Sequence, residues 1–362
     1  VVLLKNTNAI LPLGDRATRI GVFGPAHDTV NLGAYSGPSG GWGGDGVTPL
    51  DGIKSQAPEG TEVRSCSCAD DIVSVANDCD VAVYFATIRE DEGSDRSNLD
   101  LPCILEELPE SIDDTDHAII VDNREKSVAA GDQEGEILRI AESGTPLIVV
   151  LVAGSAVTMQ RWEEKANAIL LPWYGGEQGG TAIAEVLFGI TNPGGKLPLT
   201  FPKTVGQCPL HYSYKPTGRG YRYNDNDGKP QFPFGYGLSY STFEYSNLVI
   251  TPEQASADQT VTVSATIRNT SDVAGDEVVQ LYFRDSVASV AVPVKELAGF
   301  KRIRLEAGQE ETVSFALTKD HLALWNADMD RVVEPGEFEI MVGSSSEEIR
   351  LEGTLIITTT RR

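Results

Sequence analysis

The sequence predicts an α/β domain with a mostly parallel sheet, followed by an antiparallel β-sandwich. Apolar runs at 19–24, 81–87 and 147–152 alternate with segments of helical spacing in the first half of the chain. Continuously apolar strands are typical of parallel sheets that helices cover on both faces. From residue 248 onward, short strands with alternating apolar residues are separated by turns, which is typical of a sandwich.

The α/β domain is expected over 1–210. Amphipathic spacing predicts helices, for example at 132–143, where Ile137, Leu138 and Ile140 share one face. Residues 103–131 interrupt the alternation and are expected to form an inserted loop, which either rims a functional site, contacts a partner or is a surface excursion. The expected strands are 19–24, 62–66, 81–87, 147–152 and 168–171, and the expected helices are 71–78, 132–143, 156–165 and 180–188.

A change in amino-acid composition separates the two halves of the chain. Residues 202–240 are rich in Pro, Gly, Tyr and Asn and show little periodicity. Because a solvated linker would not hold so many aromatic side chains, we expect an ordered connector at 211–245, although a surface loop with scattered tyrosines remains the alternative. The sandwich is expected over 246–362, with strands at 260–269, 277–284, 312–317, 336–342 and 348–357.

Composition excludes several classes of partner. The net charge of −24 argues against nucleic acid or an anionic membrane, because phosphate groups would be repelled. No apolar run reaches the length of about 18 residues that a membrane span needs. With 4 His and 5 Cys, we expect no metal site, and the disulfide state stays open. The chain begins at Val1, so its N-terminus is expected to be processed or excised from a longer chain.

The strand at 81–87 leads into an acidic, glycine-punctuated loop at 90–96. Functional groups of α/β proteins lie in loops after the carboxyl ends of parallel strands. Glu92 is therefore a candidate catalytic acid, and Arg96 is a candidate for substrate binding and for orienting or screening carboxylates. A retaining glycosidase also needs a second carboxylate about 5 Å away, and no motif suited to that role occurs in the 362 residues. On composition alone, a solvated acidic loop is the favoured alternative.

Two other segments have features of sites. Trp42 is flanked by glycines at 40–44, so its ring either stacks on a sugar or folds back against the domain edge. Residues 173–180 join a strand to a helix but lack the dinucleotide-binding spacing, which favours a structural tight turn. Within this turn, Glu177 is a poorer acid because the helix dipole favours its ionised form.

Several longer motifs follow one another along the chain. They are VLLKN with LPL near the N-terminus, WYGGEQGG at 173–180 with AIAEVLFG at 182–189, NPGGKLP at 192–198, FPFGYGLSY at 232–240, KELAGF at 295–300, and EPG at 334–336 with VG at 342–343. These motifs, and their order, resemble those of the C-terminal α/β sandwich domain and the fibronectin type III-like domain of glycoside hydrolase family 3. The resemblance covers essentially the whole chain.

The resemblance implies how catalysis is divided between domains. In that family a (β/α)₈-type barrel supplies the nucleophilic Asp and most sugar-binding groups, and the α/β domain supplies the acid/base Glu. Glu92 matches the acid/base position in the motif EGSDR, with Glu90 as the fallback, and Trp42 resembles an aromatic directed toward the leaving-group subsite. The barrel's Ser-Asp-Trp motif is missing from this chain, so the barrel is expected on another chain or on a segment outside it.

These features together predict part of a retaining, exo-acting β-glycosidase. It is expected to hydrolyse terminal β-D-glucosyl residues of a β-glucoside or oligosaccharide, without a cofactor and only together with a barrel-domain chain. The alternatives are a β-xylosidase or other β-glycosidase, and a non-catalytic carbohydrate-binding or scaffolding protein. Because such glycosides are met outside the cytoplasm, the expected location is extracellular or periplasmic, as for a secreted protein.

Overall fold

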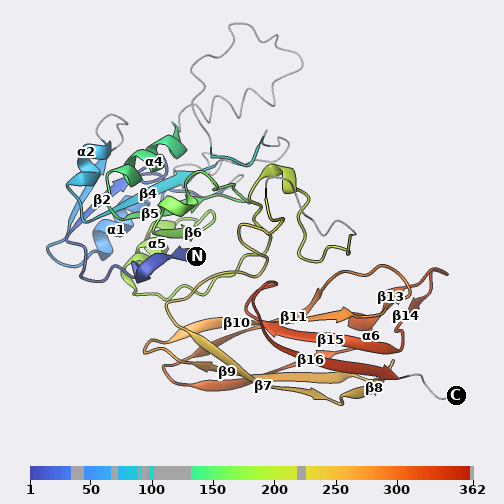
Figure 1. Cartoon of the computed structure of the whole chain (residues 1–362). Coiled ribbons are helices and arrows are strands. Elements are labelled where there is room, and N and C mark those ends of the chain that lie inside the picture. The colour runs from blue at the N-terminus through green and yellow to red at the C-terminus, as the bar shows by residue number, and fades with distance from the viewer. Residues whose placement is uncertain are drawn as a thin grey trace, which may run out of the picture. The chain divides into compact units, whose positions relative to one another are not determined.

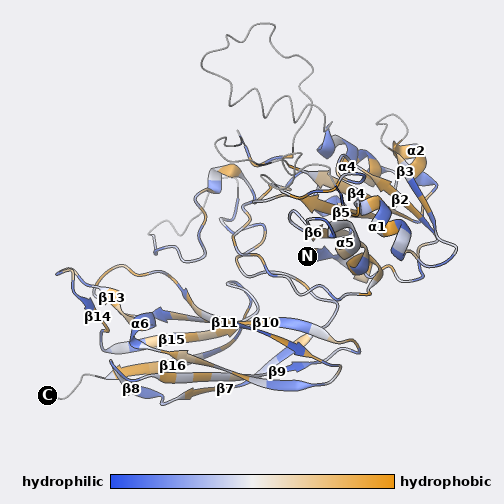
Figure 2. Cartoon of the chain, turned by 180° about the vertical axis from the view of Figure 1, so that it is seen from behind, coloured by the Kyte–Doolittle hydropathy of each residue, from blue (hydrophilic) through white to orange (hydrophobic). Residues whose placement is uncertain are grey.

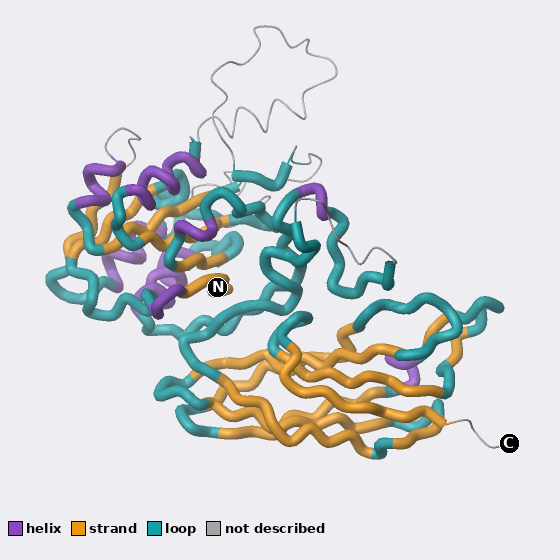
Figure 3. The backbone as a smooth tube through the Cα atoms, viewed as in Figure 1, coloured by secondary structure: helices purple, strands orange, loops and turns teal. Residues whose placement is uncertain are grey.

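The computed structural model describes residues 1–33, 45–66, 72–88, 90, 96, 98–101, 132–217 and 226–358. The chain divides into two compact units, Val1–Gly195 with Pro202–Cys208, and Lys196–Phe201 with Pro209–Arg362. Helices alternate with strands in the first unit, whereas strands dominate the second (Figure 3). The expected insertion at 103–131 lies outside the described residues. No helix of the described part is long and apolar enough to cross a membrane.

The first unit is built on a six-stranded sheet. Its elements are β1 Val2–Asn6, β2 Arg19–Phe23, β3 Glu62–Cys66, β4 Val81–Thr87, β5 Leu147–Val152, β6 Ala168–Leu171, α1 Pro49–Gln56, α2 Ile72–Asn77, α4 Gln133–Glu142 and α5 Gly179–Phe188. The strand order is β1-β6-β5-β4-β2-β3, and only β1 runs antiparallel to its neighbour. Figure 1 shows α2 and α4 on one face and α1 and α5 on the other. The predicted α/β fold is confirmed.

The sheet is buried because its central strands are apolar on both sides. Every residue of β4 and β5 is buried, and Figure 2 shows these strands at the hydrophobic end of the colour scale. Side chains just before two helices accept hydrogen bonds from backbone amides of the first turn. Thr48 accepts from the Asp51 amide before α1, and Asp132 accepts from the Gly135 amide before α4. Such caps satisfy backbone donors that have no partner within the helix.

Helix α1 and several strands of the second unit, for example Glu296–Leu305, were not among the predicted elements. Two further elements of the first unit also differ from the sequence prediction. Strand β1 was not predicted as a strand, although it pairs with β6 at the sheet edge. A strand of five residues is too short to show a hydrophobic period in the sequence. It is recognised as a strand only because it pairs with β6, which is distant in the sequence. The helix expected at 156–165 is reduced to a 3₁₀ turn at Glu163–Lys165. The Thr158 amide donates to the Leu99 carbonyl at 2.8 Å, so it has no place in a helical hydrogen-bond ladder.

The second unit is the predicted β-sandwich, and its strands pair antiparallel except at one edge, where residues 254–256 pair parallel with residues 356–358. Its strands are β7 Phe243–Thr251, β8 Gln254–Ser256, β9 Val261–Asn269, β10 Gly275–Asp285, β11 Glu296–Leu305, β12 Glu310–Leu317, β15 Gly336–Gly343 and β16 Ile349–Thr358, with a hairpin of β13 Leu324–Trp325 and β14 Arg331–Val332, and the short helix α6 Lys319–Leu322. The sheets are β11-β10-β15-β16-β8 and β12-β9-β7. Inward residues of both sheets form one core, among them Val263, Ile267, Leu281, Phe338 and Leu355.

Aromatic side chains between the two predicted domains pack within the second unit. Tyr212 stacks on Phe234 with ring centroids 4.4 Å apart, and Phe232 stacks on Tyr236 at 5.4 Å. Tyr212 also meets the ring of Tyr282 on β10 edge-on at 5.9 Å. These contacts hold residues 212 and 232–236 to the sandwich, as stacked and edge-to-face aromatic pairs do in protein cores.

One buried carboxyl group of the sandwich predicts a pH effect. Asp285 is 8% exposed, and its Oδ2 atom has no hydrogen-bond partner within the described part of the chain. Burial, helped by the charge of Glu334, raises the pKa of Asp285 above its usual value. Because burial disfavours the ionised carboxylate in the folded state, ionisation of Asp285 costs folding free energy. Asp285 therefore lowers the stability of the fold as the pH rises above the pKa of an aspartate in the unfolded chain.

The Asp285→Asn variant should therefore gain stability relative to the unmodified chain as the pH rises. Asparagine keeps the size and the acceptor for the Val287 amide but cannot ionise. Thermal unfolding of both proteins at pH 4 and pH 7 measures the effect. The difference in Tm, variant minus unmodified, should be more positive at pH 7. An equal difference at both pH values would show that Asp285 does not titrate differently on folding.

Candidate active site

The structure describes two of the four predicted site residues. Glu90 and Arg96 are described, whereas Glu92 and Trp42 lie outside the described residues. Glu90 follows β4, and its neighbours come from the segments after β5 and β6. Because these three strands are adjacent and parallel, their carboxyl ends meet at one edge of the sheet.

The end of β4 is fixed by a side chain of α4. Gln133 is fully buried, and its amide group makes two hydrogen bonds to the backbone of Thr87. Its Oε1 atom accepts from the Thr87 amide at 2.7 Å, and its Nε2 atom donates to the Thr87 carbonyl at 2.9 Å. One residue later, the Ile88 amide donates to the Val152 carbonyl at 3.1 Å. Hydrogen bonds therefore hold the backbone of Thr87 and Ile88 in place shortly before Glu90.

The Glu90 carboxylate is surrounded by donors. The Gly154 amide donates to Oε2 at 2.7 Å, and the Ser155 hydroxyl donates to Oε1. Arg96 Nε lies 3.3 Å from Oε1, whereas the Tyr174 hydroxyl, 3.5 Å from Oε2, gives its proton to the Ile88 carbonyl. The side chain of Glu90 is 19% exposed. Both oxygens of this carboxylate are therefore engaged by neighbouring groups.

Tyr174 binds the backbone on either side of residue 89. Its hydroxyl accepts from the Glu90 amide at 3.1 Å and donates to the Ile88 carbonyl at 2.7 Å. Burial, together with the nearby charge of Glu90, raises the pKa of Tyr174 well above its usual value. The phenol therefore stays protonated and keeps its role as a donor at neutral pH.

Arg96 connects Glu90 to the segment after β5. Its Nη2 atom donates to the Ser155 hydroxyl at 2.9 Å and to the Ala156 carbonyl at 2.6 Å. Its Nη1 atom is buried and has no hydrogen-bond partner among the described residues. Burial lowers the pKa of Arg96, and the charge of Glu90 opposes this shift. We call the group Glu90, Arg96, Gly154, Ser155 and Tyr174 the Glu90 cluster.

Glycine at position 154 leaves room for the side chains of Glu90 and Tyr174 in this cluster. A Cβ atom built there would lie 2.6 Å from Glu90 Oε2 and 2.9 Å from a ring carbon of Tyr174. Both distances are shorter than real Cβ contacts. The absence of a side chain thus allows the backbone amide to approach the carboxylate closely.

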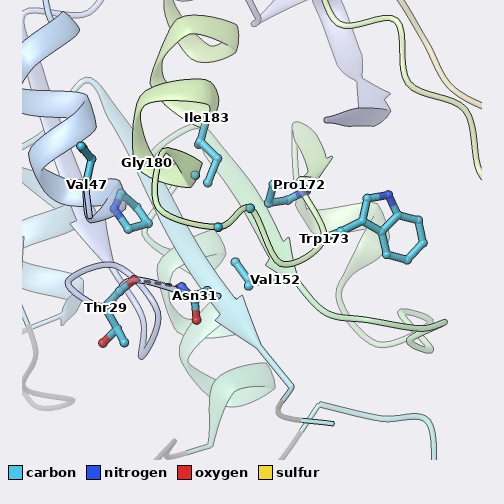
Figure 4. A pocket seen from close by; sticks show the side chains of 12 residues that line it. Thr29, Asn31, Val47, Val152, Pro172, Trp173, Gly180 and Ile183 are labelled. Atoms are coloured by element: carbon cyan, nitrogen blue, oxygen red, sulfur yellow. Dashed lines mark hydrogen bonds between the residues drawn. The ribbon is translucent and has the colours of Figure 1, made fainter. Parts of the chain in front are cut away.

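The glycine-rich turn at 173–180 encloses a space of only about 10 Å³. Figure 4 shows Asn31, Val152 and Ile183 around this space, with the ring of Trp173 pointing away from it. Asn31 Nδ2 donates to the Thr29 carbonyl at 2.9 Å, and its buried Oδ1 has no partner within the described residues. The space suits one water molecule and is too small for a sugar or a phosphate. The turn is therefore structural, in accord with the sequence prediction.

Three members of the Glu90 cluster, Gly154, Ser155 and Tyr174, were not predicted to contact Glu90. Of these, only Tyr174 lies in a segment with predicted features of a site, the turn at 173–180. The available signal was their position directly after two buried apolar runs, at 147–152 and 168–171. Parallel strands bring such positions to one edge, even though Tyr174 is 84 residues from Glu90 in the sequence.

Comparison with known protein families covers most of the chain. The Glycosyl hydrolase family 3 C-terminal domain matches residues 1–240, and the Fibronectin type III-like domain matches residues 277–346. These matches agree with the family that the sequence motifs resemble.

Individual relatives show the same relationship. A β-xylosidase from Formosa agariphila is 37% identical over 96% of this chain and 47% of its own length. A periplasmic β-glucosidase from Salmonella typhimurium is 34% identical over 97% of this chain and 48% of its own length. The solved β-glucosidase of Erythrobacter marinus is 32% identical, with a TM-score of 0.85 over 99% of this chain and 49% of its own. The β-glucosidase of Listeria innocua, solved in complex with glucose, is 29% identical, with a TM-score of 0.82 over 99% of this chain and 48% of its own. The chain thus spans about half the length of these relatives.

Proposed function

The chain belongs to glycoside hydrolase family 3, and from this premise we propose that it is the acid/base-bearing half of a retaining, exo-acting β-glycosidase that hydrolyses terminal β-D-glucosyl residues. The observation that carries the proposal is the Glu90 cluster, which brings the two ends of the segment containing Glu92 to the carboxyl edge of the sheet. In α/β proteins this edge is where ligands bind.

The proposed reaction uses two carboxyl groups. An Asp on a barrel domain attacks the anomeric carbon, and Glu92 protonates the departing glycosidic oxygen. In the second step Glu92 takes a proton from water, which attacks the covalent intermediate and releases the sugar with retained configuration. Glu90 is unsuited to this role, because both of its oxygens are engaged. Trp42 would contact the leaving-group side, and Arg96 would act through Glu90.

The barrel is proposed to lie on another chain or on a segment outside these 362 residues. The chain has no Ser-Asp-Trp motif, and its relatives are about twice as long. We use "full-length protein" below for this chain together with that barrel. The relationship to a periplasmic β-glucosidase supports a periplasmic or extracellular location.

The second candidate function is a β-xylosidase. It is favoured by the β-xylosidase relative from Formosa agariphila. Glucosyl and xylosyl residues differ in the C5 substituent. The groups that contact this substituent would lie mostly on the barrel. Relative rates of the full-length protein on aryl β-D-glucoside and β-D-xyloside therefore distinguish the two candidates.

Activity should require both halves. The chain alone is expected to give no turnover of 4-nitrophenyl β-D-glucoside or β-D-xyloside, because it lacks the nucleophile, and the full-length protein is expected to hydrolyse at least one. Native and denaturing mass spectrometry of purified material would show whether the barrel is a separate chain. Turnover by the chain alone would place the nucleophile within it. A full-length protein inactive on both substrates would favour a non-catalytic carbohydrate-binding or scaffolding role.

A further inference from the structure

The Glu90 cluster joins both ends of the segment that carries Glu92. Only five residues, 91–95, separate Glu90 from Arg96. The two flanking side chains are paired, with Arg96 Nε 3.3 Å from Glu90 Oε1. Any displacement of either residue therefore moves one of the two residues that flank the segment containing Glu92 in the sequence.

The partners that hold these ends belong to other strands. Gly154 and Ser155 follow β5, and Tyr174 follows β6. Ser155 contacts both ends at once, since its hydroxyl donates to Glu90 and accepts from Arg96 at 2.9 Å. Tyr174 holds the backbone of Glu90 rather than its side chain. The cluster therefore ties the segment to the sheet through several independent contacts.

We propose that Ser155, Tyr174 and Arg96 are positioning residues that act through Glu90 to hold Glu92 at the glycosidic oxygen of the leaving group. This inference rests on the proposed role of Glu92. A general acid must lie within hydrogen-bond reach of the atom that it protonates. A misplacement of about 1 Å can lower a rate by about 100-fold. None of the three residues needs to contact the substrate.

The chemistry of the leaving group separates positioning from general stability. An alkoxide is a poor leaving group and needs a proton from Glu92 as the glycosidic bond breaks. The 2,4-dinitrophenolate ion leaves without protonation, so its release is insensitive to where Glu92 lies. A variant that misplaces Glu92 should thus be slow on alkyl glycosides and nearly normal on 2,4-dinitrophenyl glycosides.

The test uses Tyr174→Phe and Ser155→Ala in the full-length protein. For each variant, kcat/KM is measured on an alkyl and on a 2,4-dinitrophenyl β-glycoside of the preferred sugar. We expect a loss of about 10- to 100-fold on the alkyl glycoside and a loss below about threefold on the activated one. Hydrogen–deuterium exchange should also become faster at the amides of Glu90 and Gly154, whose partners are Tyr174 and Glu90.

A matched control is available in the same unit. Tyr84 lies in the middle of β4 and donates to Glu136 Oε2 at 2.6 Å. Tyr84→Phe removes a tyrosine–carboxylate hydrogen bond without touching the Glu90 cluster. Below its unfolding temperature, this variant should keep the same ratio of rates on the two substrates as the unmodified protein.

The possible outcomes separate the inference from the proposed function. If Glu92→Ala shows the leaving-group dependence and the two cluster variants do not, the positioning role is wrong and the acid role stands. If the cluster variants lose equal factors on both substrates, their role is structural only. If Glu92→Ala itself shows no leaving-group dependence, Glu92 is not the general acid, and the proposed function is wrong.

Discussion

Replacement of Glu92 by glutamine should lower kcat/KM of the full-length protein on an alkyl β-glycoside by about 10²- to 10⁴-fold. Glutamine keeps the size of the side chain but has no proton of suitable acidity to give to the leaving oxygen. The loss should shrink steadily as the leaving group becomes more acidic, because less protonation is then required. Steady-state kinetics over a series of alkyl and aryl glycosides measures this dependence.

Glu177→Gln is the control for that experiment. Glu177 is exposed in the glycine-rich turn, outside the segment 90–96. Its substitution should leave the rates on all substrates unchanged. If Glu177→Gln showed the leaving-group dependence and Glu92→Gln did not, the assignment of the acid would be wrong.

Gly180→Ala should destabilise the first unit by about 3 kcal/mol, at the upper end of the usual range for overpacking. A Cβ atom at position 180 would lie 2.1 Å from the Thr48 carbonyl oxygen and 2.5 Å from the Val47 carbonyl oxygen. These are backbone atoms at the start of α1, so relief requires α1 and α5 to move apart. Chemical denaturation of the chain, followed by circular dichroism, measures the change in unfolding free energy.

The neighbouring glycine provides the matched control. A Cβ atom at Gly179 would meet nothing within 4 Å, and alanine is a better helix former than glycine by about 1 kcal/mol. Gly179→Ala should therefore be neutral or slightly stabilising. Equal losses from both substitutions would show that the contact between α1 and α5 is looser than the structure indicates.

The fold was largely predictable because the pattern of apolar residues is clear in most of its strands. The apolar runs at 81–87 and 147–152 coincide with β4 and β5 within the sheet, and β9 alternates as the sequence predicts. The edge strand β1 was missed because five residues carry no clear period. Residues 156–165 were misassigned, since a hydrogen bond from Thr158 to Leu99 overrides local helical spacing.

The candidate site was predictable only in part. The position of Arg96 and Glu90 after a buried strand indicated a functional edge, and the structure brings these two residues together. Their partners Ser155 and Tyr174 could not be paired with Glu90 from spacing, because 65 and 84 residues separate them. Such contacts depend on the order of strands in the sheet. The roles of Glu92 and Trp42 remain predictions.

The most direct test of the central claim is the product that the Glu92→Ala variant forms in the presence of azide. The substrate is the 2,4-dinitrophenyl β-glycoside of the preferred sugar, and proton NMR reports the anomeric configuration of the product. Azide attacks the covalent intermediate without a general base, so our account predicts faster turnover and a β-glycosyl azide. A product of α configuration, or turnover that azide does not accelerate, would contradict the account.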